Sequence, residues 1–343
     1  MKIIYYITDH GLGHSSRSVA IIREMIKKKI NVIVRSNNEK FFKKSLPNVK
    51  IILGKTDLTP IMQLNNKLIF NKNKTKKKVS KWIKDIPNMI EQEKKIIEGI
   101  NADLIISDVS CMPILLAKDL GIKSVVISNY TWNKTLELSK KDLNFIENAY
   151  SQANLIIQLP LSIPMKFPRQ LKVGLLSRRI TKSKQEIRKK LKIPNNKYLI
   201  ILAIGKNSNK IKYEKNIHIL DISNYEELGD SGKEEMVEGQ NLINAADFVI
   251  CKCGYGFISE CLSTGTKFQY ITDFHHKESF AIHKYLTKLG FQNRILTENL
   301  KKITLNSKYI KNIKNKKMKL ENNSIINKIF EEIKDDHVFP KVQ

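Results

Sequence analysis

Apolar runs of strand length alternate with amphipathic segments of helix length along most of the chain, and this alternation limits the fold more than any other feature. Residues 2–8 have the pattern of a buried strand. Residues 15–28 place Val19, Ile22 and Ile26 on one helical face, with Ser15 as the expected N-cap. The two patterns then repeat, with strands expected at 31–35, 49–53, 104–107, 124–128 and 155–158 and helices at 81–100, 113–120 and 136–152. This order predicts βαβ units that build a parallel sheet.

The alternation stops at a proline-rich stretch, where Pro160, Pro164 and Pro168 remove backbone donors and prevent helix formation. It then resumes, with strands expected at 198–204, 248–252 and 268–271 and helices at 183–191, 257–263 and 277–289. The chain has 343 residues, and chains longer than ~250–300 residues usually divide into domains. The sequence therefore predicts an α/β protein with two doubly wound, Rossmann-like parallel-sheet domains, residues 1–160 and 173–322, joined by a linker at 161–172.

The last expected helix, residues 324–334, carries an apolar stripe that must be buried against another element. The stripe consists of Ile325, Ile326, Ile329, Phe330 and Ile333. Its partner can be the second domain or, if the chain crosses back, the first. We therefore treat residues 323–343 as a separate C-terminal segment.

The net charge of +28 favours anionic partners such as phosphates, acidic lipid surfaces or nucleic acid. The excess is mainly lysine, and the Lys-rich stretch at 72–81 contains neither arginine nor aromatic residues, so we expect no nucleic-acid partner. We expect this stretch to form a loop near the acceptor side, where it would favour an anionic acceptor or a membrane surface. Drift toward AT-rich codons is the competing explanation of the lysine content.

The sequence also bears on where the protein works. Its apolar runs are far shorter than the ~20 residues of a membrane-spanning helix, and the first seven residues lack the longer apolar segment of a signal peptide. Four cysteines in a chain of this length make no disulfide framework. We expect a cytoplasmic protein, with peripheral attachment to the inner membrane surface as an option.

The first candidate site is the glycine loop after the first expected strand, with the sequence Asp9-His10-Gly11-Leu12-Gly13-His14-Ser15-Ser16-Arg17. Ligands of open parallel sheets bind at the carboxyl ends of strands, where glycines admit a ligand and a helix N-terminus favours an anion. Ser16 replaces the third glycine of a dinucleotide fingerprint, so an NAD site is only weakly supported. We expect Gly11, Gly13 and Arg17 to form an acceptor or phosphate loop. His14 can accept a proton at neutral pH, or it can simply pack beside the turn.

The second candidate site lies in residues 245–266, which follow the pattern of a strand, a glycine turn and a helix. Gly254, Tyr255 and Gly256 open the helix, and the free backbone N–H groups there can hold a diphosphate. Glu260 follows early in the helix, where its carboxylate can accept both hydroxyls of a ribose. Alternatively, Glu260 only complements the helix dipole.

The third candidate site lies in residues 270–279, after another expected strand. Asp273 and Glu278 offer acceptor oxygens for the hydroxyls of a sugar. His275 and His276 could join Glu278 in binding a metal, but the sequence offers no suitably spaced third ligand. We therefore expect neither a metal nor another bound cofactor.

Together these segments resemble the GT-B glycosyltransferases. Residues 246–289 are similar to the donor half of such enzymes, for example the lipid-linked GlcNAc transferase of peptidoglycan synthesis. The pattern G-x-G-H-x-x-R resembles their acceptor-side loop, and also the UDP-sugar hydrolase of the pseudaminic acid pathway. A closer likeness is to the glycosyltransferase-like N-terminal region of plant-type L-arabinokinases. It extends over most of residues 1–290, through the segments 5–14, 107–109, 127–132, 159–160, 183–188 and 252–256.

The resemblance implies a GT-B fold, in which two domains face each other across a cleft that binds a nucleotide sugar. It implies an inverting, metal-independent transfer of a sugar from a nucleotide diphosphate donor, with uridine the expected base, to an unidentified acceptor. His14 would act as general base, and Asp108 would orient His14 or the acceptor unless it only caps the next helix. The residues implied in donor binding are Gly205, Lys252, Gly254, Tyr255, Gly256, Ser259, Glu260, Asp273 and Glu278.

The chain also departs from the pattern of this family at two positions. Gly205 is followed by Lys206 rather than by a second glycine, and Lys267 stands where a proline is usual. A nucleotide-sugar hydrolase or epimerase would need the same site. A non-catalytic relative that binds nucleotide sugars would tolerate both departures. The sequence leaves these alternatives to sugar transfer open.

Overall fold

The structure is a computed structural model that describes residues 1–62, 70–222, 237–272 and 274–334. Its contacts divide the chain into two compact units. Unit 1 comprises Met1–Leu176, His275–Glu278 and Glu321–Gln343, and unit 2 comprises Ser177–Phe274 and Ser279–Leu320.

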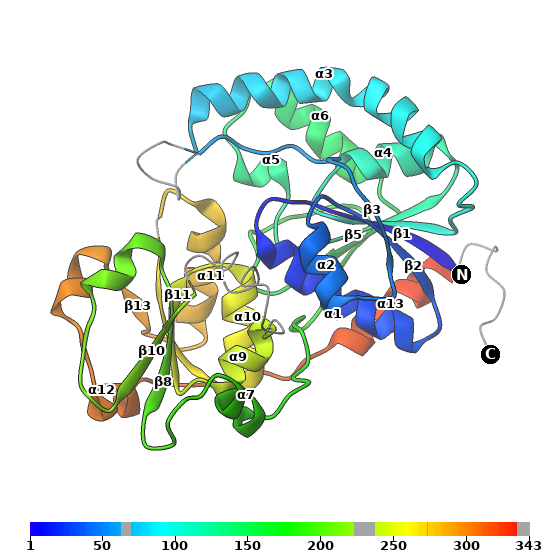
Figure 1. Ribbon diagram of the computed structural model, residues 1–343. Coiled ribbons are helices and arrows are strands. Elements are labelled where there is room, and N and C mark those ends of the chain that lie inside the picture. Colours follow the sequence, from blue (N-terminus) through cyan, green and yellow to red (C-terminus); the bar gives the residue numbers. More distant parts are fainter. Residues whose placement is uncertain (63–69, 223–236, 273, 335–343) are drawn as a thin grey trace. The chain divides into compact units, whose positions relative to one another are not determined.

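Unit 1 is built around a seven-stranded parallel sheet with the strand order β3-β2-β1-β4-β5-β6-β7 (Figure 1). The strands are β1 (Lys2–Ile7), β2 (Asn31–Arg35), β3 (Lys50–Ile52), β4 (Leu104–Asp108), β5 (Lys123–Ser128), β6 (Leu155–Gln158) and β7 (Gln170–Lys172). The central strand β1 pairs with β2 on one side and with β4 on the other. The chain passes from β3 across to β4, so the carboxyl ends of β1 and β4 form a topological switch point. Ligands of open α/β sheets bind at such points.

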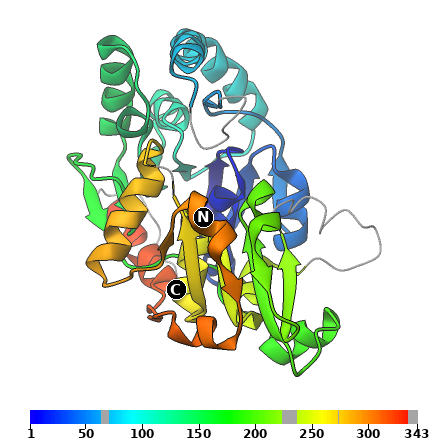
Figure 2. The same cartoon turned by 90° about the vertical axis from the view of Figure 1, so that its left-hand side faces the viewer.

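Helices cover both faces of this sheet. One face carries α3 (Lys72–Ile97), α4 (Met112–Asp119) and α6 (Lys140–Ser151), as both ribbon views show (Figures 1 and 2). The other face carries α1 (Leu12–Lys27), α2 (Glu39–Ser45) and the C-terminal helix α13 (Asn322–Lys334). Because both faces are covered, the strands are apolar along their length, and Ile3, Ile4, Tyr5 and Tyr6 are fully buried. The short helix α5 (Trp132–Thr135) follows β5.

The C-terminal helix α13 packs on unit 1, where it contacts α1 and β6. Ile325, Ile326 and Ile329 of its apolar stripe are fully buried. The ammonium group of Lys123, at the start of β5, donates a hydrogen bond of 2.8 Å to the carbonyl oxygen of Ile333. The stripe therefore has the buried environment that its sequence requires.

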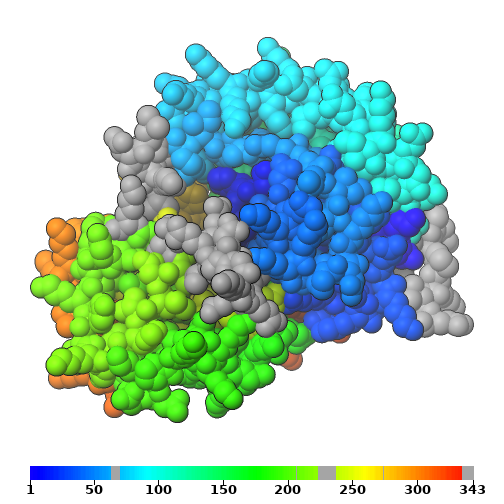
Figure 3. Space-filling view, viewed as in Figure 1, coloured from blue at the N-terminus to red at the C-terminus, as the bar shows by residue number. Residues whose placement is uncertain are grey.

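Three elements of unit 1 differ from the sequence-based expectation. Helix α1 begins at Leu12 rather than after Ser15, because the N-cap is Gly11. Residues 72–81 are not a loop, since they form the first turns of α3. Their lysines are exposed while Thr75 and Val79 are buried, and the cyan atoms of α3 lie at the surface (Figure 3). Within the expected linker at 161–172, Gln170–Lys172 pairs with β6 as the strand β7.

Unit 2 has a five-stranded parallel sheet with the order β10-β8-β11-β12-β13. The strands are β8 (Tyr198–Ala203), β10 (Ile217–Asp221), β11 (Phe248–Lys252), β12 (Lys267–Ile271) and β13 (Arg294–Ile295), and a small second sheet pairs β9 (Lys212–Tyr213) with β14 (Thr304–Leu305). The chain continues from β8 to β10 on one side and to β11 on the other. The carboxyl ends of β8 and β11 therefore form a second switch point.

The sheet of unit 2 also lies between helical layers, so unit 2 is a doubly wound α/β structure like unit 1. The helices α7 (Lys184–Lys190), α9 (Gly239–Ala245) and α10 (Tyr255–Thr264) lie on one side of it, and α12 (Ser307–Asn312) lies on the other (Figure 1). The remaining helical segments are α11 (Lys277–Lys288) and the 3-10 helices η1 (Gly205–Lys210) and η2 (Thr297–Lys302). Within the described parts of both units, no helix has the length and apolar character needed to cross a membrane.

Candidate active site

The glycine loop after β1 forms the start of α1. Its N-cap, Gly11, has a φ of 85°, a conformation that glycine adopts without steric cost, and the chain turns there directly from strand into helix. His14, Arg17 and Ser18 follow at positions i, i+3 and i+4 of the helix and share one face. The side chains of His14, Arg17 and Ser18 all reach the same carboxylate, that of Asp108. Gly13 lies in the first turn of the helix, just before His14.

Asp108 ends β4, the neighbouring strand at the switch point, and its side chain is fully buried. Arg17 Nε donates to Asp108 Oδ2 over 2.7 Å, and Arg17 Nη2 donates to Oδ1 over 2.5 Å. Ser18 Oγ donates to Oδ2 over 3.0 Å. Burial alone would raise the pKa of Asp108, but the charge and hydrogen bonds of Arg17 and His14 outweigh burial and lower this pKa to about 2. Asp108 is therefore ionised at neutral pH.

The backbone immediately after Asp108 is strained. Val109 has a φ of 68°, which a β-branched residue rarely adopts. The hydroxyl of Tyr150 donates to the carbonyl oxygen of Val109 and helps to hold this turn. Strain of this kind persists only where the surrounding structure imposes it, and it is found mostly at functional sites. The turn ends β4 sharply and fixes Asp108 beneath the start of α1.

The imidazole of His14 lies between this carboxylate and a tyrosine. The side chain of His14 is 8% exposed. Its Nδ1 atom lies 2.7 Å from Asp108 Oδ1 and 2.8 Å from Arg17 Nη2. Its Nε2 atom lies 3.0 Å from the hydroxyl of Tyr130, and the two rings meet edge to face with their centroids 5.7 Å apart. Both ring nitrogens therefore have polar neighbours.

The hydrogen bonds of these neighbours indicate which nitrogen of His14 carries the proton. The two hydrogens of Arg17 Nη2 have acceptors in Asp108 Oδ1 and in Ser128 Oγ, 3.4 Å away. With the proton on Nδ1, His14 donates to Asp108 and its Nε2 accepts from Tyr130. With the proton on Nε2, Nδ1 and Asp108 Oδ1 become two acceptors 2.7 Å apart with repelling lone pairs. We therefore assign the Nδ1–H tautomer, which leaves a lone pair on Nε2.

The network continues from Arg17 to Glu278. Arg17 Nη1 donates to Asn129 Oδ1, and Asn129 Nδ2 donates to Glu278 Oε1 over 2.9 Å. Glu278 lies in the first turn of α11, within the segment His275–Glu278 that belongs to unit 1. The sequence grouped Arg17 with a phosphate loop and Glu278 with Asp273 as a sugar ligand. In the structure Arg17 is buried in this network, and Asp273 lies outside the described residues.

The other histidine of the loop, His10, has different surroundings. Its ring centroid lies 6.1 Å from that of Trp132 and 6.4 Å from that of Phe70. Burial, together with the neighbouring imidazoles of His14 and His276, lowers the pKa of His10 to about 4. His10 is therefore neutral at pH 7 and faces aromatic rings, whereas His14 faces a carboxylate.

In unit 2 the glycine-rich turns lie at the switch point between β8 and β11. Gly205 follows β8 with a φ of 64°, and Lys252 ends β11. A Cβ atom at Gly205 would lie 3.7 Å from Lys252 Nζ, so the ammonium group is close to this turn. Gly254 is the N-cap of α10 and has no side chain to cap it, and Tyr255 and Gly256 form the first turn. The backbone N–H groups of this turn suit an anion.

Glu260 lies in the second turn of α10, below this helix start, and is buried. Arg178 donates to Glu260 Oε1 through Nε over 2.8 Å and through Nη2 over 2.6 Å. Burial raises the pKa of Glu260, and the charge of Arg178 opposes that shift. The second carboxylate oxygen, Oε2, takes part in neither bond. Ser259, the neighbouring residue, donates its hydroxyl to the carbonyl oxygen of Gly256 over 3.0 Å.

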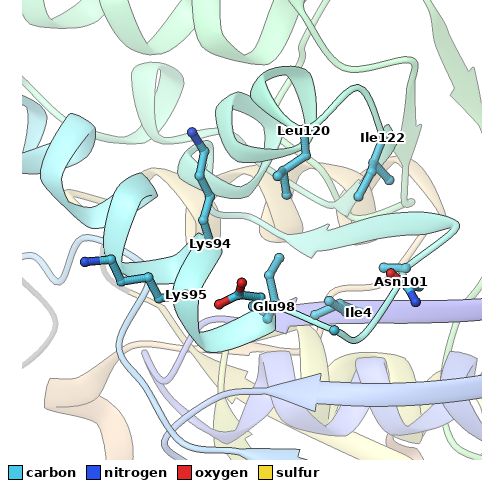
Figure 4. A pocket seen from close by; sticks show the side chains of 10 residues that line it. Ile4, Lys94, Lys95, Glu98, Asn101, Leu120 and Ile122 are labelled. Carbon is cyan, nitrogen blue, oxygen red and sulfur yellow. The ribbon is translucent and has the colours of Figure 1, made fainter.

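A surface pocket of about 520 Å³ lies in unit 1, at the ends of the strands opposite to the glycine loop (Figure 4). Its lining includes Ile4 of β1, Lys94 and Glu98 at the end of α3, and Ile122 just before β5. These residues surround the amino ends of the strands, whereas parallel sheets bind ligands at the carboxyl ends. Lys94 already pairs with acidic neighbours. We therefore place the candidate active site at the carboxyl ends of the strands. Among the described residues, no three His, Cys, Asp or Glu side chains are grouped to hold a metal ion.

Sequence reasoning named His14, Asp108 and Glu260 but missed several of their partners. Ser18 could have been found from the helical spacing that it shares with His14 and Arg17, had α1 been expected to begin at Leu12. Asn129 and Tyr130 follow the buried strand β5 in a polar run, which is a usable signal. Arg178 gave no such signal, because it lies 82 residues from Glu260 in the chain.

Comparisons with known proteins agree with this architecture. Residues 1–169 match the family model of glycosyl transferase family 1. A spinosyn rhamnosyltransferase, solved in complex with thymidine diphosphate, matches with a TM-score of 0.60 and 10% identity over 98% of this chain and 96% of that chain. A UDP-glucosyltransferase from Polygonum tinctorium matches with a TM-score of 0.55 and 11% identity over 97% of this chain and 93% of that chain. The fold is thus that of the GT-B glycosyltransferases.

A sequence relative agrees with this assignment. The L-arabinokinase of Arabidopsis thaliana is 26% identical over an alignment 297 residues long, which covers 80% of this chain and 29% of that protein. This chain therefore spans less than a third of the length of that relative. Residues 1–169 thus resemble glycosyl transferase family 1, and the chain as a whole has the fold of the GT-B glycosyltransferases.

Proposed function

We propose that the protein transfers a sugar from a nucleotide diphosphate donor to an acceptor hydroxyl, with His14 as general base. One observation carries this proposal: His14 is held at the switch point of unit 1 by the ionised Asp108, in the tautomer that leaves a lone pair on Nε2. A carboxylate that fixes the tautomer of an imidazole and stabilises its protonated form is the arrangement by which enzymes prepare a histidine to accept a proton.

The proposed donor site is in unit 2. The N-terminus of α10, with Gly254, Tyr255 and Gly256, would hold the diphosphate by backbone N–H groups, and Lys252 beside Gly205 would add a positive charge. Glu260 would accept ribose hydroxyls through Oε2. Ser259 would support the helix start. Asp273 and Glu278, of which Glu278 belongs to unit 1, are also proposed to contact the sugar. The thymidine diphosphate bound by the structural relative supports a nucleoside diphosphate as ligand. We propose a uridine one.

The proposed reaction is inverting and needs no metal. Nε2 of His14 takes the proton of the acceptor hydroxyl as the acceptor oxygen bonds to the anomeric carbon of the sugar. The bond from that carbon to the diphosphate oxygen breaks, and its electron pair leaves with the diphosphate. The helix N-terminus and Lys252 would stabilise the negative charge that develops there.

A thermal-shift screen against nucleotide sugars and free nucleoside diphosphates tests donor binding, because a ligand that binds only the folded protein raises its melting temperature. Product analysis with and without candidate acceptors then separates transfer from hydrolysis. No stabilisation by any nucleotide would contradict the proposal, and binding without turnover would favour a non-catalytic relative.

The role of His14 is tested by His14→Ala, with His10→Ala as the matched control in the same loop. A general base contributes ~10²–10⁴-fold to rate. We expect His14→Ala to lower turnover by about this factor and to leave donor binding nearly unchanged, since the residues proposed to hold the diphosphate and the ribose belong to unit 2. His10→Ala should have the smaller effect. The opposite order of effects would show that the base is not His14.

A further inference from the structure

The lone pair on Nε2 of His14, which the proposed function assigns to the acceptor proton, already accepts a hydrogen bond. Its donor is the hydroxyl of Tyr130, 3.0 Å away. Tyr130 lies in the loop after β5 and is 2% exposed. Its backbone N–H donates to Ser128 Oγ over 3.2 Å, and its ring meets that of Trp132 edge to face at 5.3 Å. The contact with His14 is therefore built into the core of unit 1.

The direction of this hydrogen bond follows from the groups around it. Burial raises the pKa of Tyr130 well above its ordinary value, so its hydroxyl keeps its proton. Asp108 is ionised and accepts a hydrogen bond from the Nδ1–H group of His14. Tyr130 is consequently the donor and Nε2 the acceptor. A hydroxyl that delivers its proton to His14 must first replace Tyr130 at this lone pair.

Water and an acceptor molecule differ in how readily they can do this. A water molecule would exchange one hydrogen bond for another and gain little. An acceptor brings binding contacts of its own, and these can offset the loss of the tyrosine contact. We propose that Tyr130 is a specificity-determining positioning residue, which occupies the lone pair of His14 until an acceptor hydroxyl displaces it and so favours transfer over hydrolysis. This inference rests on the proposed function of His14 as base.

The proton balance of the step is simple. The displaced tyrosine keeps its own proton throughout. The proton of the incoming hydroxyl moves to Nε2 of His14, while its oxygen bonds to the anomeric carbon and the diphosphate leaves with the electron pair of the broken bond. In hydrolysis the incoming hydroxyl belongs to water, and all other changes are the same. Tyr130 thus affects only which hydroxyl, that of the acceptor or that of water, reaches Nε2 of His14.

The test is Tyr130→Phe, with Tyr309→Phe as the control. Tyr309 packs against the apolar core of unit 2, and its hydroxyl donates to Gln269 Oε1 over 2.7 Å rather than to His14. The first measurement is release of nucleoside diphosphate without acceptor, from whichever of UDP-glucose, UDP-N-acetylglucosamine and dTDP-rhamnose stabilises the protein most. We expect Tyr130→Phe to raise this release by about 2- to 10-fold, the range that one neutral hydrogen bond allows, and Tyr309→Phe to leave it nearly unchanged.

The second measurement does not depend on activity. Nitrogen-15 NMR of histidine-labelled protein reports the tautomer of His14 and the hydrogen bond at Nε2. We expect the Nδ1–H tautomer in the wild type and a changed Nε2 resonance in Tyr130→Phe but not in Tyr309→Phe. An Nε2–H tautomer, or an unchanged resonance, would overturn the inference. If the resonance changes but release is equal or lower, this inference alone fails. If neither protein releases any diphosphate, either without acceptor or with any candidate acceptor, the proposed function fails with it.

Discussion

Each unit contains a buried arginine–carboxylate pair beside its glycine turn, but the two pairs are built differently. In unit 1 the carboxylate of Asp108 comes from the end of β4, and Arg17 comes from α1, the helix that follows the neighbouring strand β1. In unit 2 the carboxylate of Glu260 comes from a helix, and Arg178 lies in the segment before α7. Asp108 also holds His14 and Ser18, whereas the two bonds of Arg178 use a single oxygen of Glu260.

This difference shows how the same kind of pair can serve two purposes. Both oxygens of Asp108 bond protein groups, and one of those groups is an imidazole that it keeps in a defined tautomer. Glu260 has an oxygen outside its arginine contacts, which a ligand hydroxyl can use. We therefore expect changes in the unit 1 pair to affect folding and turnover, and changes in the unit 2 pair to affect donor affinity.

The largest effect should come from removing the carboxylate in unit 1. Asp108→Ala leaves the buried guanidinium of Arg17 without its counter-charge, and breaking a buried ion pair in this way costs ~3–5 kcal/mol. We expect a loss of about this size in the free energy of unfolding, measured by urea denaturation with circular dichroism. Asp108→Asn keeps the shape and an acceptor oxygen, so its loss should be smaller. Equal stability of Asp108→Ala and wild type would show that this network does not support the fold.

The network around Asp108 also shows how far the sequence could be used. The alternation of strands and helices predicted both parallel sheets, and the positions of Gly11, His14 and Asp108 followed because ligands gather at the carboxyl ends of strands. The expected loop at residues 72–81 was wrong, because a helix tolerates a lysine face where residues such as Val79 supply the buried one. The pairing of Arg178 with Glu260 could not be predicted, since tertiary folding alone joins them.

The next effect concerns the pair in unit 2. Glu260→Ala removes the carboxylate proposed to bind a ribose, and losing hydrogen bonds to a charged group should weaken donor binding by ~1.5–3 kcal/mol. Isothermal titration with uridine diphosphate measures this directly, and His14→Ala should bind with unchanged affinity. Titration is preferred to a melting experiment, because the variant also leaves Arg178 without its partner and is expected to be less stable.

Glu238→Gln is the matched control for that experiment. Glu238 Oε1 lies 3.9 Å from Arg178 Nη1, so this change alters the charge near Arg178 while Glu260 stays in place. We expect nearly wild-type affinity from Glu238→Gln. Equal binding by wild type and Glu260→Ala would reduce Glu260 to a structural residue and would remove the contrast between the two units.

The smallest effect in the wild type is the pH dependence of stability, because the two further buried groups of unit 1 that should control it act in opposite directions. Asp57 accepts hydrogen bonds from Trp132 Nε1 at 3.1 and 3.2 Å. Burial raises the pKa of Asp57 from 3.8 to about 7, although its hydrogen bonds oppose the shift. Between these values the folded protein keeps a proton that the unfolded chain has lost. The contribution of Asp57 to stability is therefore fully present below pH 3.8 and falls as the pH rises to about 7.

His10 should act in the opposite direction, because its pKa is lowered from 6.5 to about 4, so stability rises with pH in that range. Each group contributes at most about 1.4 kcal/mol per pH unit, and in the wild type the two contributions largely cancel. Removing one group should therefore leave the change of unfolding free energy with pH that the other group causes. We expect Asp57→Asn to gain stability as the pH rises from about 4 to 6.5, and His10→Asn to lose stability over the same range. Urea denaturation at several pH values measures both slopes. Slopes of the same sign in the two variants would show that at least one of these groups does not titrate as its environment requires.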